Sequence, residues 1–128
     1  MFKDRILMFL SIFSFINFLG CAQQDKDSTM TVQELKKLMK DDSTLVILDV
    51  RTPRELVGSL GKIDNVINIP IQELESRIGE LKEYKGREIA VICRSGNRSN
   101  TGMRILRKNG FNAKNVLGGM IEYKRLSK

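Results

Sequence analysis

One cysteine in this chain lies where the sequence best supports thiol chemistry. Cys93 follows an apolar run that ends at Ile92, and a loop of small and basic residues leads from it to a helical pattern starting at Ser99. A cysteine between a buried strand and a helix N-terminus meets unpaired backbone N–H groups, which favour negative charge. Arg94 and Arg98 add two positive charges. These surroundings predict a nucleophilic thiol of lowered pKa, in a loop that can also hold an anion.

The amino-acid composition excludes several other kinds of catalytic and metal site. The chain of 128 residues has no histidine and two cysteines, Cys21 and Cys93. Histidine-based dyads, triads and metal sites are therefore excluded, and two distant cysteines do not make a zinc site. The net charge is +7, but basic residues are scattered among acidic ones. We expect no metal, no other cofactor and no nucleic acid, and the excess charge favours small anions or an anionic lipid surface.

Residues 1–20 have the pattern of a signal peptide. A charged start precedes an uncharged run over residues 6–20. A spanning helix needs about 20 apolar residues, so this run is typical of the hydrophobic region of an export signal. Its end, Gly20-Cys21, resembles the lipobox of bacterial lipoproteins. The resemblance implies that Cys21 is lipidated and anchors the protein facing the periplasm, and Ala22 favours the outer membrane. The alternatives are an uncleaved anchor and a disulfide between Cys21 and Cys93, which lipidation would prevent.

The mature chain alternates predicted strands and helices after a polar tether at residues 21–28. The predicted strands lie within 45–50, 65–70, 88–93 and 113–119. The predicted helices cover 31–40, 52–56, 71–84, 100–109 and 120–126. This order predicts one α/β domain over residues 29–128 with a mostly parallel central sheet flanked by helices. Ligands bind such sheets at the carboxyl ends of strands, and both Asp49 and Cys93 fall at such ends.

Three segments in this order are similar to a single-domain rhodanese, a sulfurtransferase. They are residues 49–70, 91–99 and 115–120. The resemblance covers residues 29–128 and implies the rhodanese-like fold. It also implies that Cys93 accepts a sulfane sulfur from thiosulfate or a similar donor, forming a persulfide. Cyanide or an external thiol then removes the outer sulfur, and no cofactor takes part.

The resemblance further implies roles for the residues around Cys93. Those that cradle the persulfide and bind substrate are Arg94, Ser95, Gly96, Asn97, Arg98 and Ser99. The two arginines suit an oxyanion such as thiosulfate, and Ser99 can cap the following helix and donate into the loop. Asp49 and Arg51 are supporting residues, which we expect to pair with each other or with the loop. We expect Glu55 to lie on a solvated helix face.

Loop length separates sulfur transfer from related chemistries. Four residues separate Cys93 from Arg98, whereas cysteine-dependent phosphatases of related fold have five, which widens the cradle for phosphate. The spacing therefore favours a sulfurtransferase over a phosphatase or an arsenate reductase. A second hypothesis is a sulfur-carrier or protein-binding module of the same fold without appreciable turnover. We expect a monomer whose partners are small sulfur anions, an external acceptor and, through Cys21, the membrane.

Overall fold

Two continuous apolar runs form the centre of a parallel sheet. The computed structural model describes residues 27–128, in which β2 (Val46–Asp49) pairs with β4 (Glu88–Ile92). Asp49 lies opposite Ile92, so the carboxyl ends of both strands reach the same edge. Neither run alternates polar and apolar residues, because helices cover both faces of the sheet.

Three shorter strands complete the sheet. β3 (Ile67–Asn68) pairs with β2, β5 (Asn112–Val116) pairs with β4, and β1 (Thr29–Met30) pairs with β5. The strand order is β1-β5-β4-β2-β3, and every pair is parallel. The predicted α/β fold is therefore confirmed. The sequence did not predict β1, whose two residues are too few to give a pattern.

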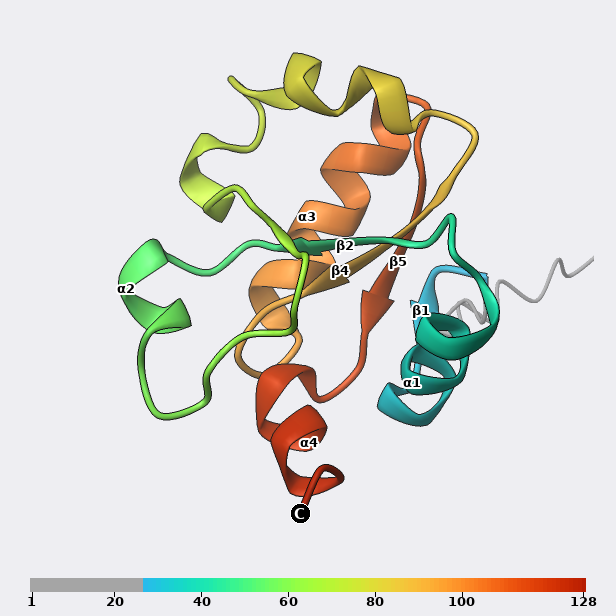
Figure 1. Cartoon of the computed structure of the whole chain (residues 1–128). Coiled ribbons are helices and arrows are strands. Elements are labelled where there is room, and N and C mark those ends of the chain that lie inside the picture. The colour runs from blue at the N-terminus through green and yellow to red at the C-terminus, as the bar shows by residue number, and fades with distance from the viewer. Residues whose placement is uncertain (1–26) are drawn as a thin grey trace, which may run out of the picture.

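Two helices cover one face of the sheet (Figure 1). α1 (Val32–Asp41) begins with the predicted capping box, in which the N–H of Glu34 donates to Thr31 Oγ1 at 3.1 Å. α4 (Gly119–Arg125) lies beside α1 at the other end of the described chain. Both helices bury apolar side chains against the sheet, where Leu35 and Met120 belong to one core cluster.

The other face is covered by α3 (Asn97–Lys108) and by two 3₁₀ helices, η1 (Ile71–Glu73) and η2 (Ile78–Tyr84). The predicted single helix over residues 71–84 is therefore wrong. Gly79 weakens a continuous α-helix there. The apolar spacing still places Leu74 and Leu81 fully inside the core, and tertiary packing settles the local geometry. A short helix, α2 (Pro53–Leu56), follows the carboxyl end of β2.

The predicted signal peptide and Cys21 lie outside the described residues. Within residues 27–128, no helix is long and apolar enough to cross a membrane. The last two residues of the predicted tether contact the domain. The backbone carbonyl of Ser28 accepts a hydrogen bond from Asn115 N–H at 2.8 Å, and that of Asp27 accepts one from Arg107.

Candidate active site

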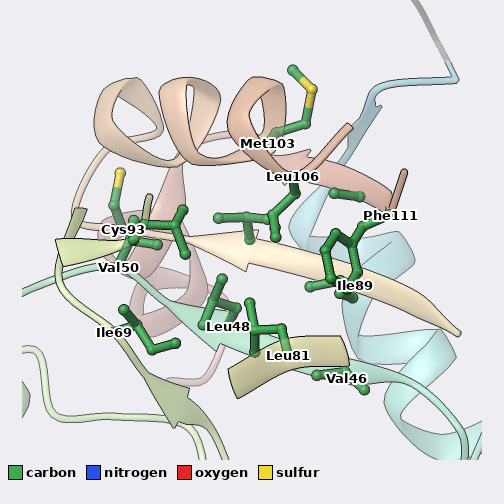
Figure 2. Close-up of a cluster of buried hydrophobic side chains, with 13 residues drawn as sticks. Val46, Leu48, Val50, Ile69, Leu81, Ile89, Cys93, Met103, Leu106 and Phe111 are labelled. Atoms are coloured by element: carbon green, nitrogen blue, oxygen red, sulfur yellow. The ribbon is translucent and has the colours of Figure 1, made fainter. Parts of the chain in front are cut away.

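The Cys93 thiol lies at the carboxyl end of β4, where the core meets the loop. Cys93 is 1% exposed, and Figure 2 shows it beside Val50 at one end of a cluster of buried side chains. The backbone N–H of Gly96 donates to Cys93 Sγ at 3.1 Å, and Ser99 Oγ lies 3.2 Å from the same sulfur. The loop therefore folds around the sulfur.

Two opposing effects set the pKa of the Cys93 thiol. Burial raises the pKa, because a thiolate is costly away from water. Hydrogen bonds from the Ser99 hydroxyl and from the N–H groups of Ser99, Gly96 and Ser95 lower it. The hydrogen bonds outweigh burial, and the pKa lies below its ordinary value. Backbone N–H groups thus stabilise the thiolate in a protein that has no histidine.

The loop turns at Gly96, which has a φ of +108°. Such an angle suits glycine and strains other residues. α3 begins directly after this turn, at Asn97, and no side chain caps it. The predicted start near residue 100, with Ser99 as the cap, is therefore wrong, because the turn at Gly96 begins the helix three residues earlier. Ser99 lies in the first turn of the helix, where its buried hydroxyl faces the sulfur.

The N-terminus of α4 holds the first residues of the loop. Met120 N–H donates to the carbonyl of Cys93 at 2.9 Å, and Ile121 N–H donates to the carbonyl of Arg94 at 3.1 Å. Gly119 fits against the same backbone: a Cβ built there would lie 2.5 Å from the Cys93 carbonyl oxygen. These contacts fix the peptide planes from which the loop starts.

Arg98 binds a protein carboxylate. Its two terminal nitrogens donate to the two oxygens of Glu55 at 2.8 and 2.9 Å, which differs from the predicted anion-binding role. Glu55 is partly solvated, with 34% of its side chain exposed, but its carboxylate also accepts this hydrogen bond pair and caps α2 through Thr52 N–H at 2.9 Å. The Arg98 hydrogen bond is the main cause that lowers the pKa of Glu55 to about 2.

Asp49 and Arg51 form a buried pair beneath the loop. Arg51 Nη2 donates to Asp49 Oδ2 at 2.7 Å, and the two side chains are 0% and 1% exposed. Arg51 Nη2 also donates to the Gly61 carbonyl at 2.8 Å. A buried charge needs such partners, so the pair links the end of β2 to the segment after α2.

A cavity of about 140 Å³ lies between α2 and the start of the loop over residues 93–96, here called the active loop. Its lining residues are Arg51, Glu55, Gly58, Ser59, Leu60 and Arg94. Arg94 is exposed, as are Ser95 and Asn97. Of Arg94 and Arg98, Arg94 is the one that lines this cavity and can meet a small anion there. Within residues 27–128, no group of three or more acidic or cysteine side chains is arranged to hold a metal.

Sequence reasoning missed Asn115 on β5. Its Oδ1 accepts from Ser99 Oγ at 2.6 Å, and its Nδ2 donates to the Gly96 carbonyl at 3.2 Å. The available signal was a polar residue inside a strand whose neighbours Ala113 and Val116 are apolar and buried. Glu55 was also missed, although Thr52 and Glu55 have capping-box spacing.

The sequence profile of the rhodanese-like domain matches residues 31–126. The chain belongs to this family. A rhodanese-related protein from Thermoplasma volcanium is 34% identical, and its structure superimposes with a TM-score of 0.69 over 77% of this chain and 92% of that one. This likeness agrees with the five-stranded parallel sheet and its flanking helices.

Relatives of this rhodanese domain are named for sulfur chemistry. The adenylyltransferase and sulfurtransferase MOCS3-2 of Zea mays is 35% identical over 101 residues, 74% of this chain and 20% of its own length. The putative sulfur carrier protein YrkF of Bacillus subtilis (strain 168) is 37% identical over 95 residues, 73% of this chain and 49% of its own. The chain thus spans a fifth to a half of these two relatives.

Proposed function

We propose that this rhodanese domain transfers a sulfane sulfur through a persulfide on Cys93. The observation that carries the proposal is the buried Cys93 sulfur, which accepts a hydrogen bond from Gly96 N–H at 3.1 Å and lies 3.2 Å from Ser99 Oγ. A thiolate held by backbone N–H groups is nucleophilic without a side-chain base. The names of the relatives, sulfurtransferase and sulfur carrier, agree with this chemistry.

The reaction has two steps, with thiosulfate or a similar anion as donor. The Cys93 thiolate attacks the outer sulfur of thiosulfate, the sulfur–sulfur bond breaks, and sulfite leaves with the electron pair. An external thiolate or cyanide then attacks the outer sulfur of the persulfide and restores the Cys93 thiolate. The same N–H groups stabilise the negative charge of the thiolate and of the persulfide.

A sulfur-carrier module with little thiosulfate turnover is the second candidate. One observation favours it: Arg98 binds Glu55, so Arg94 is the loop arginine that remains to line the cavity. A site with one such arginine binds a divalent anion less strongly than a site with two. The carrier would receive its sulfur from a partner protein.

Cys93→Ser tests the persulfide. We expect the full-length protein to gain one sulfur on tryptic peptide Glu88–Arg94 after thiosulfate treatment, to lose it on addition of cyanide, and to form thiocyanate. The Cys93→Ser variant should keep its circular dichroism spectrum and lose both signals, because an alcohol does not form the persulfide.

Cys21→Ser is the matched control, and it should keep both signals. Sulfur gain without thiocyanate turnover would favour the carrier. Full thiocyanate formation by Cys93→Ser would show that the proposed mechanism is wrong.

We also propose that the protein is an exported lipoprotein attached through Cys21. The support comes from the sequence alone: a charged start, an uncharged run and Gly20-Cys21. Several acyl chains anchor a protein firmly, whereas a single chain does so only marginally. Sulfur transfer would then take place at a membrane surface in the periplasm.

A further inference from the structure

Three buried polar side chains from different elements form a row beneath the active loop. Cys93 directly follows β4, Ser99 lies in the first turn of α3, and Asn115 is in β5. Ser99 Oγ is 3.2 Å from Cys93 Sγ and 2.6 Å from Asn115 Oδ1. Ser99 is 0% exposed and Asn115 is 4% exposed, so neither side chain readily turns to bulk water.

The Ser99 hydroxyl has one hydrogen for two neighbouring acceptors. Asn115 Oδ1 can only accept, and the amide is held in this orientation because its Nδ2 donates to the Gly96 carbonyl. A thiolate at Cys93 also only accepts, whereas a thiol can donate. The direction of the Ser99 hydroxyl is therefore tied to the charge on the sulfur.

We infer that Asn115 is a positioning residue that competes with the Cys93 thiolate for the hydrogen of Ser99. With Cys93 as a thiol, the S–H group donates to Ser99 Oγ, and Ser99 donates to Asn115 Oδ1. With Cys93 as a thiolate, the hydroxyl turns to the sulfur and leaves Oδ1 of the buried amide without its donor. Loss of that hydrogen bond opposes thiolate formation.

Within the proposed function, on which this step rests, the competition follows the reaction. Once the persulfide forms, negative charge moves to the outer sulfur and Cys93 Sγ becomes a neutral, weak acceptor. The Ser99 hydroxyl then returns to Asn115 Oδ1. Asn115 thus holds the hydroxyl when Sγ is neutral and releases it when Sγ is charged.

The elements around this row carry several charged groups. Arg98 on α3 interacts electrostatically with Cys93 and is bound to Glu55 of α2. Asp49 at the end of β2 is paired with Arg51, and Arg94 follows Cys93 in the loop. On the remaining elements, Lys114 of β5 pairs with Glu88 of β4, and Glu122 of α4 pairs with Arg125. Substitution of Asn115 or Ser99 replaces none of these groups.

The test measures the pKa of Cys93 from the pH dependence of its alkylation by iodoacetamide. The full-length protein is used, and tryptic peptide Glu88–Arg94 reports Cys93 separately from Cys21. We expect Asn115→Leu to lower the pKa by about half a pH unit to one unit, because Ser99 is free to donate to the thiolate. Ser99→Ala should raise the pKa.

The double variant Ser99→Ala/Asn115→Leu separates positioning from a general structural effect. If Asn115 acts through Ser99, the substitution at Asn115 shifts the pKa little in the Ser99→Ala background. Asn112→Leu, at an exposed position of the same strand, should leave the pKa unchanged. Asn115→Ala serves as the second variant if Asn115→Leu does not fold.

An unchanged or raised pKa in the folded Asn115 variant would overturn the inference, as would an equal shift with and without Ser99. Alkylation requires no sulfur donor. The outcome is therefore independent of whether Cys93 forms a persulfide, and failure of one proposal is distinguishable from failure of the other.

Discussion

Glu55 determines which groups Arg98 can bind. Its carboxylate accepts two hydrogen bonds from Arg98 and one from the N–H of Thr52, so one side chain links α2 to the first turn of α3. Arg98, in the first turn of α3, is thereby held in place, and its charge is partly neutralised. Arg94 lines the cavity wall, and within the proposed function it would meet the incoming anion.

Glu55→Gln should destabilise the protein at neutral pH by about 1 kcal/mol, because a half-exposed ion pair and a helix cap are weakened together. The pKa of Glu55 is lowered from 4.5 to about 2. A lowered carboxyl pKa gives stability that is present above the unfolded-state pKa and is lost as pH falls through the folded-state pKa. The difference between variant and wild type should therefore shrink between pH 4.5 and about 2.

Urea unfolding at a series of pH values measures this difference. Glu80→Gln is the control, since Glu80 pairs with Arg77 on the protein surface, away from the loop. It should leave the urea midpoint nearly unchanged. A difference between Glu55→Gln and wild type that stayed constant down to pH 2 would contradict the assignment of the lowered pKa to this pair.

At the scale of elements, the active loop is held between two helices. α3 begins directly after the loop, and the N-terminus of α4 binds the carbonyls of Cys93 and Arg94. Gly119 makes this approach possible, because its φ of +55° and its missing side chain let the α4 backbone lie against the loop.

Gly119→Ala should cost roughly 3 kcal/mol of stability and reduce the reactivity of Cys93. The added methyl group would meet the carbonyl oxygens of Cys93 and Arg94 at 2.5 and 2.6 Å. Thermal unfolding and iodoacetamide alkylation measure the two effects. Gly79→Ala is the matched control, because a Cβ at that position meets nothing within 4 Å. Equal unfolding temperatures for the two variants would argue against the close packing at Gly119.

At the scale of the whole molecule, local sequence patterns predicted individual strands and helices but not the contacts between distant residues. The apolar runs before Asp49 and Cys93 predicted β2 and β4, and the Thr31 capping box predicted α1. The contacts Glu55–Arg98 and Ser99–Asn115 join residues far apart in sequence, and no local pattern encodes them. Residues 71–84 kept their apolar spacing but not the predicted helix type, because tertiary packing overrides helix propensity.

The proposed anchor makes a prediction about the full chain. Expressed in a Gram-negative bacterium, the protein should incorporate labelled palmitate and fractionate with membranes. Cys21→Ala should abolish the label, because the thiol that carries the acyl chain is gone. Cys93→Ala, the control, should be labelled like the wild type. An unlabelled wild-type protein would show that the lipoprotein proposal is wrong.

The strand order also determines when the sheet can be completed while the chain is being synthesised. β5 lies between β1 and β4, so residues near the start of the domain pair with residues near its end: Thr29 with Asn115 and Met30 with Val116. Such long-range pairing waits for most of the chain. Cys93 leaves the ribosome before Asn115 and before the α4 N–H groups that bind its carbonyl. A nascent chain that ends before α4 therefore lacks the hydrogen bonds that hold the carbonyls of Cys93 and Arg94, and the loop is fixed in place only after the last helix has been made.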